Sequence, residues 1–212
     1  MHIKNVHFMK MTKPKPLIII FSLCCLLLAI SLFHKSILIK TARYLSVSRP
    51  VDGEVLIIEG WINSNALIEA VEVFKNSDYK YLLITANHEN FSAIETIKNA
   101  GLEERLIRMA ERGDNSTGHN TFDMANAAKI WLSNNDPSIK NVDVFTASVH
   151  GRKSWVVFSR VFGKEYEVGI KSSNCFRRDP QRWGRSRAGK KRIAKNLLGY
   201  FYAMLWPFGL YT

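Results

Sequence analysis

The feature that most constrains this 212-residue chain is an alternation of short apolar runs with longer amphipathic segments after Pro50. The apolar runs are rich in Val, Ile and Leu and have the length of buried strands. We predict strands at 55–58, 81–85, 106–109, 142–147 and 165–171. Between them, apolar residues recur at helical spacing, and we predict helices at 66–76, 92–100, 121–133 and 152–162.

A strand followed by a helix, four times over, predicts an α/β domain with a mainly parallel sheet between two helical layers, a Rossmann-like fold. In such sheets, ligands bind beyond the carboxyl ends of the strands, near the point where the strand order reverses. A functional site is therefore expected in the loops that follow the strands. These loops are 59–63, 86–91, 112–120 and 148–152.

The segment 17–33, LIIIFSLCCLLLAISLF, contains no charge. As a helix it is roughly 26 Å long, close to the thickness of the hydrocarbon core of a bilayer. A cleaved signal peptide is the alternative, but no small-x-small cleavage site follows Ala29. We predict one N-terminal transmembrane helix, an uncleaved signal anchor. Basic residues flank it on both sides, so charge does not decide its orientation.

Composition defines which partners are expected. The 30 Lys and Arg against 18 Asp and Glu give a net charge of +12, which calls for an anionic partner: nucleic acid, an anionic membrane surface or a phosphorylated ligand. The three Cys have neither a disulfide framework nor metal-ligand spacing, and no metal site is predicted. The expected organisation is a basic segment (1–16), the anchor (17–33), a linker (34–52), the α/β domain (53–172) and a basic segment with an aromatic C-terminal helix (173–212).

Two of the loops place polar residues where a ligand is expected. Glu59, Gly60 and Trp61 follow the first strand, and Glu59 needs a partner because four apolar residues precede it. Asn120 and Thr121 stand at the start of a helix. They either cap this helix or, together with it, bind a phosphate or carboxylate at its N-terminus.

The fourth loop adds cations at the start of a helix, where positive charge opposes the helix dipole. Solvated surface charge is one interpretation, and an anion held between the cations and the helix end is the other. We assign Arg152 to the anion, and His150 to acid–base chemistry with Glu59 orienting it or holding a hydroxyl. The candidate catalytic residues are therefore His150 and Glu59. The candidate ligand-binding residues are Gly60, Trp61, Asn87, Asn120, Thr121, Ser148 and Arg152.

Several of these residues also belong to motifs. They are a strand ending in a glycine loop (55–61), a strand and loop (82–87), N-T-aromatic-acidic-x-A (120–125) and T-x-S-x-H-x-R (146–152), followed by an aromatic helix that Gly163 closes. In this order the region from about Gly53 to Gly163 resembles the YdcF/SanA/ElyC-like proteins, a bacterial family.

The resemblance implies a Rossmann-like fold behind a single-pass anchor in the bacterial inner membrane, with the domain in the periplasm and a role in cell-envelope integrity. One member of the family is described as binding S-adenosylmethionine, so the resemblance implies this cofactor. The chain departs from the family at Glu59, Gly60 and Trp61, where a glycine run is usual. This departure weighs against the same cofactor.

The C-terminal region combines charge with aromatic residues. Residues 171–195 contain ten Lys or Arg and a single acid, and the uncharged stretch 197–211 is rich in Tyr, Trp and Phe. We consider three interpretations: a last helix packed on the sheet, contact of residues 171–212 with anionic lipid, and nucleic-acid binding, which the predicted anchor disfavours.

These observations lead to one leading hypothesis and two alternatives. The leading hypothesis is a membrane-anchored cell-envelope protein that binds a phosphate-bearing or other small anionic ligand, in envelope polysaccharide or lipid-carrier metabolism. The alternatives are a non-catalytic scaffold of an envelope polymer pathway and an S-adenosylmethionine-binding protein. The sequence does not decide whether the protein is an enzyme.

Overall fold

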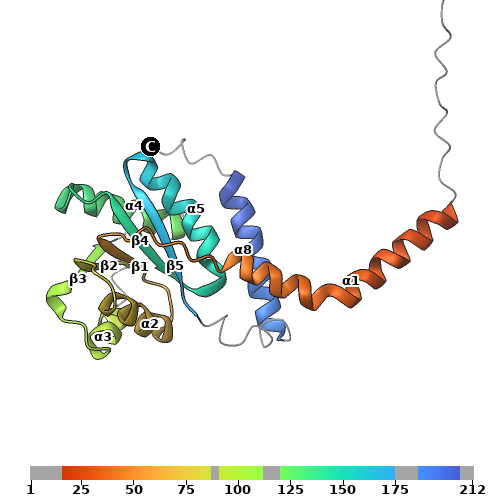
Figure 1. Ribbon diagram of the computed structural model, residues 1–212, viewed down its shortest axis with the longest axis horizontal. Helices are drawn as coiled ribbons and strands as arrows, with labels where there is room; N and C mark the ends of the chain where they lie inside the picture. The colour runs from red at the N-terminus through yellow and green to blue at the C-terminus, as the bar shows by residue number, and fades with distance from the viewer. Residues whose placement is uncertain (1–15, 87–90, 112–119, 175–185, 206–212) are drawn as a thin grey trace, which may run out of the picture. The chain divides into compact units, whose positions relative to one another are not determined.

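The computed structural model describes residues 16–86, 91–111, 120–174 and 186–205 (Figure 1). The chain forms two compact units, Met1–Ile37 and Leu38–Thr212. Asn87 and the interior of the loop 112–120 lie outside the described residues, as do 175–185 of the basic segment and the last seven residues of the chain. The larger unit contains the whole sheet.

Five parallel strands form the sheet. They are β1 (Val55–Glu59), β2 (Tyr81–Ala86), β3 (Ile107–Glu111), β4 (Asn141–Thr146) and β5 (Glu167–Ser172), in the order β3-β2-β1-β4-β5. The prediction of a Rossmann-like α/β domain with a parallel sheet is confirmed. The strand order reverses between β1 and β4, so the carboxyl ends of these two strands mark the expected position of a ligand.

Helices cover both faces of this sheet (Figure 1). They are α2 (Ser64–Lys75), α3 (Phe91–Asn99), α4 (Asn120–Asn135) and α5 (Gly151–Phe162). Side chains alternate between the faces along each strand. In β1, Leu56 and Ile58 pack in the cluster with α2 and α3, whereas Val55 and Ile57 pack in the cluster with α4 and α5. Burial on both faces explains why the strands are continuous apolar runs rather than alternating ones.

The helix α1 (Pro16–Leu45) extends beyond the apolar segment, so residues 34–45 of the expected linker are helical. At its end, Ala42 and Leu45 pack with Val149 and Ile193 in a small core of their own. Within the residues that the structure describes, no helix combines the length and the apolar character needed to cross a membrane.

The helix α8 (Arg187–Leu205) begins inside the basic segment, ahead of Leu197, where the aromatic helix was expected. It packs against α5, and its residues Ile193 and Ala203 are buried. Arg160 of α5 donates hydrogen bonds to the carbonyls of Ala203 (2.6 Å) and Met204 (2.9 Å), near the end of α8. A cation is favourable at this end of a helix. Helix α8 is therefore part of the same compact unit as the sheet.

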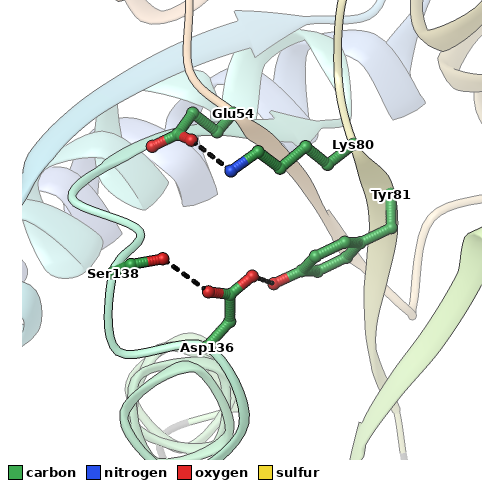
Figure 2. A network of polar contacts seen from close by, with 5 residues as sticks. All are labelled: Glu54, Lys80, Tyr81, Asp136 and Ser138. Carbon is green, nitrogen blue, oxygen red and sulfur yellow. Dashed lines mark hydrogen bonds and ion pairs between the residues drawn. The ribbon is translucent and has the colours of Figure 1, made fainter.

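A polar network joins the starts of β1 and β2 to the connection between α4 and β4 (Figure 2). Lys80 and Glu54 form an ion pair (2.6 Å). The Tyr81 hydroxyl donates to Asp136 Oδ2 (3.4 Å), and Ser138 donates to Asp136 Oδ1 (2.8 Å). These groups are partly exposed, and such surface contacts contribute at most about 1 kcal/mol each. The network belongs to the amino edge of the sheet, opposite the expected site.

Buried Asp143 holds the segment that precedes β1. Its Oδ1 accepts from the backbone N–H of Val51 (2.9 Å), and its Oδ2 accepts from Gly53 N–H (3.1 Å) and the Tyr79 hydroxyl (2.9 Å). On the neighbouring strand, a Cβ at Gly169 would lie 1.9 Å from Asp143 Oδ1. Gly169 therefore leaves the space in which the Asp143 carboxylate collects its three donors.

Candidate functional site at the carboxyl edge of the sheet

Glu59 is the last residue of β1 and is fully buried. Ser154 of α5 donates to Glu59 Oε2 (2.9 Å), and the hydroxyl of Thr146, the last residue of β4, donates to the same oxygen. These two hydroxyls are the partners that the sequence required. Among the described residues, Glu59 Oε1 has no hydrogen-bond partner. One carboxyl oxygen is thus held in place, and the other is buried without a hydrogen-bond partner among the described residues.

Burial raises the pKa of Glu59 above its ordinary value of 4.5. The hydrogen bonds from Thr146 and Ser154, the charge of Lys153 and the nearby Trp61 indole oppose this shift, and burial outweighs them. The Trp61 indole lies outside hydrogen-bonding geometry, since Oε1 remains without a partner. Glu59 therefore keeps its proton to a higher pH than an exposed carboxyl group.

His150 is oriented by the helix α8. Asn196 Nδ2 donates to the Arg192 carbonyl (2.9 Å), which leaves Asn196 Oδ1 as an acceptor 2.5 Å from His150 Nδ1. This pattern assigns the ring proton to Nδ1. The other nitrogen, Nε2, then carries a lone pair and lies 3.4 Å from the Thr121 hydroxyl at the start of α4. His150 thus presents an acceptor toward α4.

Burial lowers the pKa of His150 to about 3. The charges of Lys153 and Lys195 contribute to this lowering, and the hydrogen bond to Asn196 opposes it. At neutral pH the imidazole is therefore an uncharged base. The Trp61 ring contacts it edge-on, with 4.7 Å between centroids, while 43% of Trp61 remains exposed. Trp61 therefore supports His150 and still offers area to a ligand.

The positive charge of Lys153 lowers the pKa of both candidate catalytic residues, Glu59 and His150. Burial lowers the pKa of Lys153 itself, Lys195 of α8 adds to the lowering, and Glu59 opposes it. The methylene stem of Lys153 lies along α8, where a Cβ at Gly199 would be 3.4 Å from its Cδ. Among the described residues, Lys153 Nζ has no hydrogen bond or ion pair. Lys153 and Lys195 thus repel each other, and among the described residues no acidic side chain forms an ion pair with Lys153.

Arg152, the residue assigned to the anion from the sequence, is engaged elsewhere. Its Nε donates to the Tyr44 carbonyl (2.7 Å), and its guanidinium lies 3.8 Å from the centroid of the Tyr44 ring. Successive residues of a helix point about 100° apart, so Arg152 and Lys153 face different neighbours. The positive charges that act on His150 come from Lys153 and Lys195.

Ser148 is buried in the connection between β4 and α5. Its N–H donates to Ser173 Oγ (3.0 Å), and its hydroxyl lies 3.4 Å from that of Ser46. The backbone of Ser148 has φ 29°, in a region that L-residues seldom adopt. Ser148 therefore forms part of the turn that brings His150 to the carboxyl edge, and its hydroxyl lies against that of Ser46.

The remaining candidates are spread along the edge. Gly60 is buried, and its N–H donates to the Thr85 carbonyl (2.9 Å). Asn120 is exposed at the start of α4, and Asn87 lies outside the described residues. The structure therefore brings together Glu59, Trp61, Thr121 and His150 from the predicted set.

Ser154, Lys195 and Asn196 are not among the site residues predicted from the sequence. Ser154 and Asn196 could have been found by the same sequence feature, because each is a polar residue on the buried face of its helix. A polar side chain in that position needs a hydrogen-bond partner, and near a strand end this partner is often a functional group. Lys195 has no such signal, since it is one of several cations on α8.

No family model, curated protein or solved structure matches the chain. The likeness to the YdcF/SanA/ElyC-like proteins therefore rests on the motifs alone. In the described part of the chain, no group of three or more His, Cys, Asp or Glu side chains is placed to hold a metal ion. The chemistry available at this edge is that of a neutral imidazole base, a buried carboxyl group, a cation and an aromatic face.

Proposed function

We propose that the carboxyl edge of this sheet binds a phosphate-bearing ligand in a membrane-anchored cell-envelope protein of the YdcF/SanA/ElyC type. The observation that supports the proposal is Lys153, whose pKa is lowered by burial and by repulsion from Lys195, and which lacks a contacting counter-ion among the described residues. An anion between them relieves this repulsion and forms charge-assisted hydrogen bonds.

The neighbouring groups suit a ligand that carries hydroxyl groups as well as phosphate. The neutral His150 accepts a proton or a hydrogen bond at Nε2, and Glu59 has a buried Oε1 that has no hydrogen-bond partner among the described residues. The exposed part of Trp61 offers an aromatic face to a sugar ring. If the protein is an enzyme, His150 as base and Glu59 as acid fit transfer or hydrolysis on a phosphate-linked sugar or lipid carrier.

The proposed anchor, residues 17–33, supports the membrane setting. Within α1 the large apolar side chains Ile18, Phe21 and Leu28 are each more than half exposed. A row of exposed apolar groups is costly in water and favours a bilayer or a partner. By the family resemblance, we place the anchor in the bacterial inner membrane and the domain in the periplasm.

We expect Lys153→Met to lower the stabilisation of the full chain by phosphate-bearing ligands by about half or more. The measurement is thermal unfolding in mild detergent with inorganic phosphate, a nucleotide sugar, a short-chain polyprenyl phosphate or S-adenosylmethionine. A ligand at a hundred times its dissociation constant stabilises by about 2.7 kcal/mol, which raises Tm by roughly 5–10 °C. The loss of a charged hydrogen bond, about 1.5–3 kcal/mol, weakens binding roughly 10- to 100-fold.

Lys164→Met is the matched control, because it removes the same charge from an exposed lysine just after the far end of α5. The proposal requires a shift in the wild type and in Lys164→Met that falls by about half or more in Lys153→Met. The absence of a shift with every phosphate compound would contradict it and favour the scaffold hypothesis. A shift with S-adenosylmethionine alone would favour the methyl-donor hypothesis.

A further inference from the structure

The outer face of α8 carries large apolar side chains at the spacing of one helical face. The members of this apolar stripe are Leu198 (71% exposed), Phe201 (53%), Tyr202 (47%) and Leu205 (84%). They follow the pattern i, i+3, i+4, i+7, which places them along one line of the helix. The buried residues Ile193, Asn196 and Ala203 lie on the opposite face. The buried face of α8 thus packs against the domain, and the stripe on the other face is exposed.

Cations continue the same line toward the start of α8. At 100° per residue, Arg187 and Lys191 align with Leu198, and Lys195 lies within 60° of it. All three are exposed. Helix α8 contains five Lys or Arg and no Asp or Glu. One face therefore combines cations at one end with aliphatic and aromatic groups at the other.

This combination fits the surface of an anionic bilayer. Cations there pair with lipid phosphates, and aromatic and aliphatic side chains enter the boundary between headgroups and acyl chains. A second copy of α8 would bring five more positive charges against the first five, and this repulsion opposes self-association through the stripe. The charge of the surface thus favours lipid over another copy of the chain.

We propose that α8 docks on an anionic lipid surface through the apolar stripe and the exposed cations before it. Lys195 belongs both to this surface and to the proposed phosphate site, whereas the stripe, Arg187 and Lys191 lie on the opposite face of α8 from Asn196, so the docking does not depend on that site. It has a consequence for that site, however. Since Asn196 holds His150, docking of α8 keeps the candidate site close to the lipid headgroups.

The test places a fluorescent label on the stripe of the full chain in lipid nanodiscs. Cys24, Cys25 and Cys175 are replaced by Ser, and a single NBD label is attached at Phe201→Cys. The matched control is Ile68→Cys, because Ile68 is also an exposed apolar residue (42%) but lies on α2, which covers the other face of the sheet. The nanodiscs contain either phosphatidylglycerol with phosphatidylcholine or phosphatidylcholine alone.

In phosphatidylglycerol discs we expect the label at Phe201→Cys to be blue-shifted, quenched by brominated lipid and several-fold less quenched by aqueous iodide than the label at Ile68→Cys. In phosphatidylcholine discs this protection decreases. Equal iodide quenching at the two positions in phosphatidylglycerol discs overturns the docking while leaving the anchor intact. Protection that is independent of lipid charge, with cross-links between copies at this position, shows a second copy as the partner and also overturns it.

A chain that does not co-purify with phosphatidylglycerol discs contradicts both the anchor and the docking. Phosphate binding is measured separately through Lys153→Met. A failure of the docking is therefore distinguishable from a failure of the proposed phosphate site.

Discussion

The wild-type protein is expected to lose about 2–3 kcal/mol of its free energy of unfolding between pH 6.5 and 4.5 because of His150 alone. The pKa of His150 in the folded protein is about 3, below its ordinary value of 6.5. As the pH falls below 6.5, the unfolded chain takes up a proton at this residue and the folded chain does not. Its contribution to stability is therefore complete above pH 6.5 and is lost as the pH falls toward 3.

The comparison that isolates this effect is urea unfolding of the wild type and His150→Gln at pH 8, 6.5, 5.5 and 4.5. Glutamine donates a hydrogen bond to Asn196 but does not titrate. All other ionisable groups are common to both proteins, so their contributions cancel. The difference in stability between the two proteins should shrink by about 2–3 kcal/mol toward pH 4.5. A difference that is independent of pH would contradict the burial of a neutral His150.

The second large effect is expected for Asp143→Ala, which should destabilise the domain by about 3–5 kcal/mol. The substitution leaves the N–H groups of Val51 and Gly53 and the hydroxyl of Tyr79 without their shared acceptor. Unsatisfied buried donors cost about 1–3 kcal/mol each. Urea unfolding at pH 7 measures the loss.

Two control variants separate this network from ordinary polar contacts. Tyr79→Phe removes one of the three donors and should cost about 1 kcal/mol. Asp136→Ala removes a carboxylate from the half-exposed network of Figure 2 and should cost at most about 1 kcal/mol. A cost for Asp143→Ala no larger than that for Asp136→Ala would show that Asp143 does not hold the entry to β1.

The fold was predictable because its strands are buried on both faces and therefore stand out as apolar runs. The four predicted helices begin and end within two residues of the observed bounds. The start of α8 was not predicted, because the many cations between Arg187 and Arg192 are typical of a solvated segment. Their helical state depends on Ile193 and Ala203 packing against the rest of the domain, which is a tertiary effect.

The candidate site was predictable only in part. The strand-end position of Glu59 and the motif around His150 indicated where the site lies. They did not indicate which residues form hydrogen bonds with Glu59 and His150. Arg152 and Lys153 are adjacent in sequence, and the contact of Arg152 with Tyr44, more than a hundred residues away, decides which of them faces the site. Asn196 lies 46 residues from His150 in sequence, and its role follows from the packing of α8 against α5.

We propose that a neutral His150 and the cation Lys153 together recognise phosphate at the carboxyl edge of the sheet. The most direct measurement is a nitrogen-15 NMR titration of the His150 ring with inorganic phosphate at pH 7.5 and constant ionic strength. We expect an unprotonated Nε2 whose resonance moves with phosphate in the wild type and in Lys164→Met, but not in Lys153→Met. A protonated Nε2 at this pH, or a resonance that phosphate leaves unchanged in the wild type, would contradict the account.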